Sequence, residues 1–145
     1  MDSRFFLALV LVCTSYILGF FYTAFEALGD VLFIILVVST IIDTLLLFSQ
    51  PEGIKAERFV PQRLSNGDNN SIRLSIQSSY NFATQISIID EIPHQFQIRN
   101  FKLNASLDKH EQKGFSYDLR PTTRGEFEFG NINVMVSSTI GFIRR

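Results

Sequence analysis

Residue types that build metal sites and disulfides are scarce in this sequence, which has one cysteine and two histidines in 145 residues. Tryptophan is absent. Because Cys13 is alone, an intramolecular disulfide and a multi-cysteine metal site are both excluded. His94 and His110 lie far apart in sequence, and we expect them to be surface loop residues rather than metal ligands or an acid–base pair. The sequence therefore predicts no metal and no cofactor.

An excess of charge is also absent, because 13 Lys and Arg residues stand against 14 Asp and Glu residues. We therefore expect no nucleic-acid partner. Glycine-rich phosphate loops, serine-nucleophile elbows and paired-histidine zinc motifs do not occur. Asp90 and Glu91 are adjacent, and adjacent side chains of a strand point to opposite faces, so they are not expected to share a catalytic site. We predict that the protein is not an enzyme.

Hydrophobic residues are concentrated in the first 50 positions. Residues 5–25 contain no charge and no proline, and residues 31–48 contain one charge, Asp43. Each stretch approaches the ~20 residues that a helix needs to cross a bilayer. Residues 26–30 are too few for anything but a tight turn. The sequence predicts that residues 1–50 form a hairpin of two transmembrane helices, with the lipid bilayer as a partner.

Basic residues flank this hairpin and acidic residues occupy its predicted turn. Arg4 precedes the first stretch, Lys55, Arg58 and Arg63 follow the second, and residues 26–30 carry only acidic charge. The positive-inside rule then predicts that both termini are cytoplasmic.

Two alternatives for the first stretch are disfavoured. A cleaved signal peptide would have an apolar core of about 7–15 residues and a small-residue cleavage site, neither of which fits. A lipoprotein signal at Cys13 would need a small residue where Val12 stands.

Asp43 is the polar residue of the second stretch that is a candidate functional site. An intramembrane carboxylate is a functional candidate by default. Its place close to the end of the stretch favours a structural carboxylate near the headgroups. Since no second charge lies inside either stretch, an ion or proton path is not expected.

From Pro51 onward the sequence alternates between apolar and polar residues, which is typical of half-buried strands. We expect strands at residues 71–78, 84–90, 96–98, 115–119 and 126–136. Turn residues recur about every 10 positions, the spacing of a sandwich or barrel. The sequence predicts an all-β, immunoglobulin-like sandwich of about seven strands over residues 51–145.

The segment 120–125 is the most distinctive stretch between two predicted strands. Pro121 sets a turn, Gly125 would supply a backbone conformation closed to other residues, and Arg124 could bind loop carbonyls or Glu126. Tyr117 precedes this turn. We interpret these residues as a structural corner, with a partner contact as the alternative.

A succession of short motifs after a helical hairpin resembles a bacterial family called "domain of unknown function fifty-eight". The matching residues are Arg63, Leu64, Gly67, Asp90, Pro93, Tyr117, Leu119, Pro121, Arg124, Gly125, Phe127, Gly130, Gly141, Phe142 and Arg144. The sequence departs from the family at Ser138 and Thr139, where an Asp-Pro pair is usual. It also stops at Arg145, where the family continues into a von Willebrand factor A-like domain.

The resemblance implies a bacterial inner-membrane protein that works with a MoxR-type AAA+ ATPase and with von Willebrand factor A-like membrane proteins. Within that reading, this chain supplies the anchor and a protein-binding β domain. Two other functions stay open. The β domain could sense a small ligand, or the chain could be the N-terminal fragment of a protein whose active module lies after residue 145.

Overall fold

A computed structural model describes residues 3–98 and 101–145 of the chain. The described residues form two compact units. The first, which we call the helical unit, joins residues 3–51 with Ser137–Arg145. The second, the strand unit, is Glu52–Val136.

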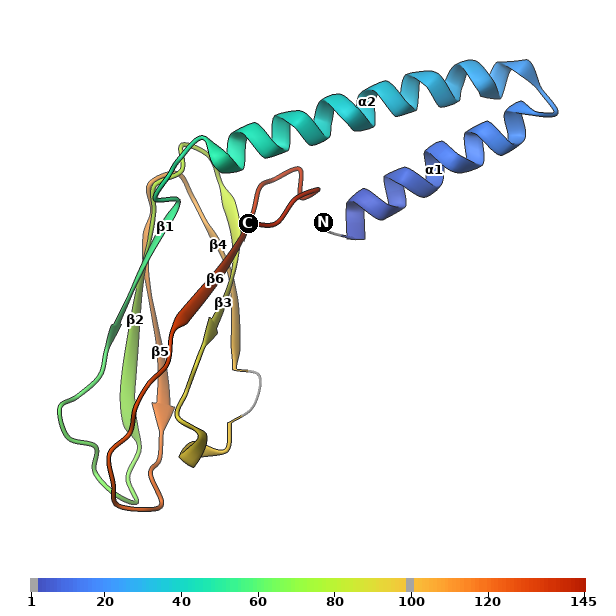
Figure 1. Ribbon diagram of the computed structural model, residues 1–145. Helices are drawn as coiled ribbons and strands as arrows, with labels where there is room; N and C mark the ends of the chain where they lie inside the picture. The colour runs from blue at the N-terminus through green and yellow to red at the C-terminus, as the bar shows by residue number, and fades with distance from the viewer. Residues whose placement is uncertain (1–2, 99–100) are drawn as a thin grey trace. The chain divides into compact units, whose positions relative to one another are not determined.

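The helical unit contains two antiparallel helices, α1 at Ser3–Gly19 and α2 at Thr23–Phe48 (Figure 1). The helices are joined by residues 20–22, so the predicted turn at 26–30 is wrong. Those residues lie instead in the first turns of α2. Glu26 in the first helical turn is favourable because the amino end of a helix carries partial positive charge.

Close contacts at the helical turn explain why the chain reverses there. A Cβ atom on Gly19 would lie 3.0 Å from the Glu26 backbone nitrogen, so only glycine permits this approach. The Tyr16 hydroxyl donates a hydrogen bond of 2.8 Å to Asp30, which ties the two helices together. Gly29 faces the Tyr16 ring, where a Cβ would lie 3.2 Å away.

The last nine residues, which the sequence analysis assigned to the β domain, lie with the helices. The Phe142 ring meets Phe5 of α1 edge to face, with 6.1 Å between ring centroids. A bridge between Ser137 and Arg144 turns this segment back on itself. We call residues 137–145 the C-terminal segment.

The strand unit consists of two three-stranded sheets (Figure 1). The first sheet has the order β1-β2-β5 and the second the order β4-β3-β6. In chain order the strands are β1 Ile54–Phe59, β2 Asn70–Ser78, β3 Thr84–Asp90, β4 Lys102–Leu107, β5 Gln112–Leu119 and β6 Ile132–Ser137. An all-β domain after a helical N-terminus is therefore confirmed, with six strands among the described residues.

The two sheets bury alternate residues of their strands against each other. Ile72, Leu74 and Ile76 of β2 are at most 1% exposed, which confirms the predicted face of this strand. Ile86 and Ile88 of β3 are buried in the same way. Antiparallel pairing of β2 with both β1 and β5 places the buried residues of the first sheet on one side.

The strand predictions differ from the structure in several places. Strand β4 was not predicted, and β5 begins at Gln112 rather than at residue 115. Residues 94–96 form a 3-10 turn after Pro93 rather than a strand, since Pro93 lacks an amide proton for strand pairing. In residues 126–136 regular pairing begins only at Ile132. Strand β1 was missed because Arg58 occupies an inward position, where the sequence pattern requires an apolar residue.

Candidate functional site

A charged side chain from the first sheet meets a buried carboxylate from the second inside the strand unit. Arg58 of β1 forms an ion pair with Asp90 at the end of β3, and their side chains are 11% and 0% exposed. Arg58 Nε lies 3.2 Å from Asp90 Oδ2, and a second bond joins Nη2 to Oδ1. A bidentate pair of this kind fixes both position and orientation.

Two further groups complete this network. The Tyr117 hydroxyl of β5 donates a 2.5 Å hydrogen bond to Asp90 Oδ2. The Arg58 guanidinium donates to the Gly130 carbonyl at 3.1 Å and lies 5.0 Å from the centre of the Phe129 ring. Arg58, Asp90 and Tyr117 thus join both sheets and the loop before β6.

Burial and the Asp90 carboxylate raise the pKa of Tyr117 above its usual value. Burial raises the pKa because the phenolate would lose water, and the carboxylate raises it by accepting a hydrogen bond from the neutral phenol and by repelling the phenolate charge. The Tyr117 hydroxyl therefore keeps its proton and acts as a hydrogen-bond donor to Asp90. This arrangement fixes Asp90 rather than activating it, since each oxygen of the carboxylate accepts a hydrogen bond.

Asp90 and Glu91 point to opposite sides, as strand alternation predicts. Asp90 is buried, whereas Glu91 is exposed and accepts hydrogen bonds of 2.9 Å from the Asn131 amide and the Asn133 side chain. Gly130 lies so close that a Cβ would meet the Glu91 side chain at 2.3 Å. Glu91 therefore holds the start of β6, and the two carboxylates form separate sites.

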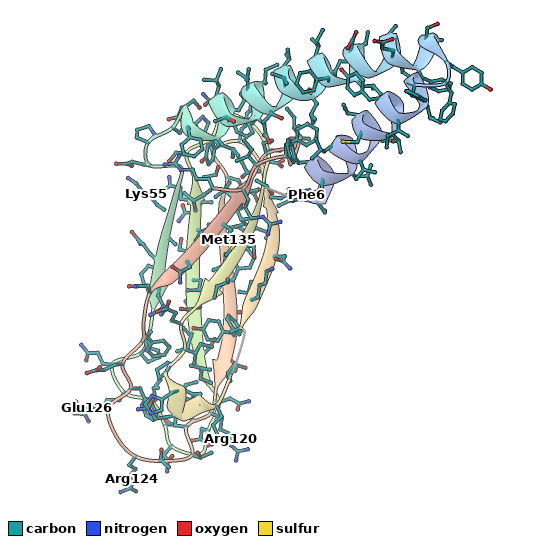
Figure 2. All side chains as sticks on the ribbon, turned by 45° about the vertical axis from the view of Figure 1, so that its right-hand side comes forward. Phe6, Lys55, Arg120, Arg124, Glu126 and Met135 are labelled. Carbon is teal, nitrogen blue, oxygen red and sulfur yellow. The ribbon has the colours of Figure 1, made fainter. Side chains whose placement is uncertain are left out.

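The corner after β5 is built around Pro121, with Arg120 in the role that the sequence analysis gave to Arg124. Arg120 Nε donates to the Gly67 carbonyl at 2.6 Å, and the Gly67 amide donates to the Pro121 carbonyl at 2.9 Å. Arg124 is exposed and makes no side-chain hydrogen bond to any described residue. Figure 2 shows its side chain pointing outward from the loop.

Gly125 does not have the special backbone conformation expected of it. Its φ lies outside the left-handed region, and a Cβ at this position would meet nothing within 4 Å. Gly67, with φ of 85°, supplies the left-handed turn instead. Gly125 therefore contributes open space rather than a backbone turn.

That open space belongs to a hollow of about 500 Å³ between two loops of the strand unit. We call it the loop hollow, and it is lined by residues 60–64 and by Gly125, Glu126, Phe127 and Phe129. Phe127 is held in place by Phe96, with 4.9 Å between their ring centroids. The structure thus brings together Arg63, Leu64, Gly125 and Phe127, which the sequence analysis had named from distant motifs.

Comparison of this chain with family models, curated proteins and solved structures finds no match. The resemblance to the "domain of unknown function fifty-eight" family accordingly stays a prediction from the motifs alone.

The two histidines lie in separate turns of the strand unit. His94 is exposed on the 3-10 turn, and His110 has a φ of 53° in the turn before β5. In the described ranges 3–98 and 101–145, no group of three or more His, Cys, Asp and Glu residues is arranged to hold a metal ion.

Asp43 of α2 is completely buried in the helical unit. Its carboxylate accepts hydrogen bonds from the backbone amides of Phe142 and Ile143 at 2.9 and 2.8 Å. The Ser138 hydroxyl donates a further bond to its other oxygen. We call this arrangement the Asp43 cradle, and it satisfies a buried carboxylate with three donors from the C-terminal segment.

Two arginines fasten the same segment to the helices. Arg145 donates to the carbonyls of Leu47, Gln50 and Pro51 at 2.9, 2.8 and 3.1 Å, beyond the last turn of α2. A cation at this position also complements the partial negative charge at a helix end. Arg4 of α1 donates to the Thr139 carbonyl at 3.2 Å.

Sequence reasoning named Asp43 but missed what it binds. The donors are two backbone amides and one serine, and backbone amides carry no sequence signal. Ser138 had been noted only as a departure from the family motif. The role of Arg58 was missed for a similar reason, because a lone arginine in a strand gives no hint of a carboxylate in the opposite sheet.

Proposed function

We propose that this protein is a non-enzymatic, membrane-anchored interaction module. In this proposal α1 and α2 form a two-span hairpin in a bacterial inner membrane, with both chain ends in the cytoplasm. The strand unit is an immunoglobulin-like sandwich that docks partner proteins, among them a MoxR-type AAA+ ATPase.

The observation that supports the anchor is the exposed apolar surface of α2. This helix is long and apolar enough to span a membrane, and only 17% of its most apolar 18-residue window is buried. Among the described residues, all but four of the exposed large apolar side chains lie between Phe6 and Phe48. A core helix of a soluble protein would be mostly buried, so a lipid environment accounts best for this surface.

The second span rests on α1, which is shorter. Its 17 residues correspond to about 26 Å at the rise of an α-helix, close to the ~30 Å of a hydrocarbon core. The aromatic residues Phe20, Phe21 and Tyr22 at the turn are strongly exposed, and Tyr22 is of the type found at membrane interfaces. A thin or locally compressed bilayer would accommodate such a hairpin.

A topology experiment tests the anchor. A reporter active only in the cytoplasm, fused after Arg145, is expected to be active, and a reporter inserted at Phe21 is expected to be inactive. Activity of a periplasmic reporter after Arg145 would contradict the proposed orientation. Release of the protein from membranes by alkaline carbonate would contradict the anchor itself.

The loop hollow supports the interaction role. It combines apolar residues such as Leu64 and Phe127 with the charged residues Arg63 and Glu126, a mixture suited to recognition of a protein segment. It also collects residues that carry the family resemblance. We propose that a partner protein occupies this hollow.

Filling the hollow tests this step. Gly125→Trp is expected to fold normally, because a side chain there meets open space, and to reduce co-purification of a MoxR-type ATPase at least fivefold. The matched control is Thr123→Trp, an exposed position in the same loop that does not line the hollow. Equal recovery of the ATPase with both variants, or none with the unaltered protein, would contradict the proposal.

A second candidate function is the sensing of a small ligand, favoured by the volume of the loop hollow. About 500 Å³ lies within the roughly 300–1,000 Å³ typical of ligand sites. A thermal-shift screen of the detergent-solubilised protein tests this function. Stabilisation by a small molecule that Gly125→Trp abolishes and Thr123→Trp retains would support it.

A further inference from the structure

A second hollow lies on the outer face of the first sheet, which is the face turned away from the core. Its volume is about 660 Å³. Ser75, Gly114 and Ser116 form part of its floor, and Phe59, Val60 and Pro61 border it. We call it the sheet groove.

The strand register explains why this surface is hollow. Phe59, Arg73 and Ser116 are paired across β1, β2 and β5, and Ser75 pairs with Gly114 in the next outward row. Alternation places these side chains on the same outer face. The small residues of β2 and β5 thus leave a depression beside the ring of Phe59.

The border of the sheet groove is apolar and exposed. Among the described residues outside the helical hairpin, only four large apolar side chains are exposed, namely Phe59, Val60, Ile98 and Met135. Phe59 and Val60 are consecutive and both border the groove, with exposed fractions of 55% and 37%. The two exposed side chains therefore give the groove an apolar border.

Arg73 supplies the charge in the sheet groove. It is the one charged side chain among the described residues that line it. In residues 3–98 and 101–145 its guanidinium has neither an ion pair nor a side-chain hydrogen bond. Its five donors are therefore available to an anionic group, and a carboxylate matches their geometry.

Neither backbone conformation nor packing within the protein requires glycine at position 114. Glycine in a strand interior is destabilising and often marks a place where another chain approaches closely. Its φ is not positive, and the nearest atom to a Cβ there would be the Leu74 carbonyl oxygen at 4.0 Å. The protein itself would therefore accommodate a larger side chain at position 114. Glycine at this position leaves the space above the sheet open to another chain.

We propose that the sheet groove binds an extended segment of a partner protein in which an acidic and an apolar residue stand two positions apart, so that both side chains point to the sheet. The carboxylate pairs with Arg73, and an apolar side chain two positions away packs against Phe59 and Val60. Close approach of the segment to the sheet depends on Gly114. The inference rests on the proposed interaction function and adds the chemistry of one partner segment.

Peptide binding to the full-length protein in detergent micelles tests the proposal. The probe is a fluorescein-labelled octapeptide with serine at every odd position and valine and glutamate in turn at the even positions, so that valine and glutamate share one face of the extended chain. Matched peptides carry glutamine or lysine in place of glutamate. The glutamate peptide is expected to bind at least tenfold more tightly than either matched peptide. Arg73→Gln is expected to remove this preference.

Gly114→Val separates binding from folding. It is expected to leave the thermal midpoint unchanged or higher, because valine favours strands, and to weaken peptide binding at least tenfold. The control is Gln77→Val, on the same outer face but outside the sheet groove, which should bind as the unaltered protein does.

Three outcomes would overturn the inference: equal binding of all three peptides, unchanged binding by Gly114→Val, or binding only to vesicles that contain phosphatidylglycerol. The last outcome would assign Arg73 and Phe59 to the membrane surface. Co-purification of the ATPase tests the loop hollow and is independent of peptide binding. Absence of peptide binding together with normal ATPase co-purification would therefore reject the sheet groove alone. Loss of ATPase recovery with intact peptide binding would reject the ATPase partner instead.

Discussion

The backbone amide of Ile143 lies 2.8 Å from a carboxylate oxygen of Asp43, a residue 100 positions earlier in the chain. The amide of Phe142 shares the same oxygen, and the Ser138 hydroxyl donates to the other. The C-terminal segment follows β6 directly, so the strand that ends the second sheet continues into the Asp43 cradle. Asp43 therefore holds the C-terminal segment against α2 within the helical unit.

Replacement of Asp43 by alanine is expected to release the C-terminal segment. Hydrogen bonds to a charged group contribute about 2 kcal/mol each, so loss of one such contribution accelerates amide exchange at Phe142 and Ile143 by roughly 30-fold. Hydrogen exchange measured by mass spectrometry in detergent micelles checks this. Thr44→Ala is the control, because the Thr44 hydroxyl bonds only to the Thr40 carbonyl within α2. Equal protection in both variants would contradict the cradle.

The Arg58–Asp90 ion pair is expected to stabilise the strand unit only while both partners are present. Asp90→Ala leaves a buried guanidinium unpaired and should lower the free energy of unfolding by about 3 kcal/mol. The double variant Arg58→Met with Asp90→Leu should lose less, since no unpaired charge remains buried. Urea unfolding followed by circular dichroism measures both. A double variant less stable than Asp90→Ala would show that the pair contributes more than charge compensation.

Stability is expected to fall at alkaline pH because of Tyr117. Its pKa is raised in the folded state, so folded protein retains the phenolic proton after the unfolded chain has lost it. Stability is fully present below about pH 10, the ordinary tyrosine value, and decreases as the pH rises from there toward the folded pKa. Thermal midpoints between pH 8 and pH 11.5 should decrease less steeply for Tyr117→Phe. Identical slopes for the two proteins would refute this assignment.

Arg120 and Arg124 are expected to differ although they lie four residues apart. Arg120→Gln removes the bond to the Gly67 carbonyl and should lower the free energy of unfolding by about 1 kcal/mol. Arg124→Gln should change it by less than about 0.5 kcal/mol, because the side chain is exposed and contacts no described side chain by a hydrogen bond. Thermal unfolding of the two variants provides the comparison. The reverse order would return the structural role to Arg124.

Two strands with several buried isoleucine and leucine residues were predicted from sequence. The expected strand at residues 84–90 coincides with β3, and the strand expected at 71–78 begins one residue earlier, at Asn70. The buried isoleucine and leucine residues of these two strands carry the alternation, and Asp90 at the end of β3 is a buried charged exception. Strand β1 escaped prediction because its inward Arg58 is stabilised by Asp90, and that carboxylate is 32 residues away.

The turn of the helical hairpin was misplaced for a related reason. The turn was predicted at residues 26–30 because Glu26 and Asp30 interrupt the apolar sequence there. The chain reverses earlier, at residues 20–22, because Gly19 permits close approach to Glu26 and Tyr16 binds Asp30. Both contacts join different helices, so local composition does not reveal them.

By itself the sequence determined that a long apolar segment precedes an alternating, strand-rich region, because hydrophobic periodicity depends only on the order of neighbouring residues. It also singled out Asp43 as the one charge within the second apolar stretch. Only the tertiary structure decided which partners Asp43 and Arg58 have, because backbone amides and distant carboxylates come together through folding. The grouping of Ser137–Arg145 with the helices follows from the same long-range bonds.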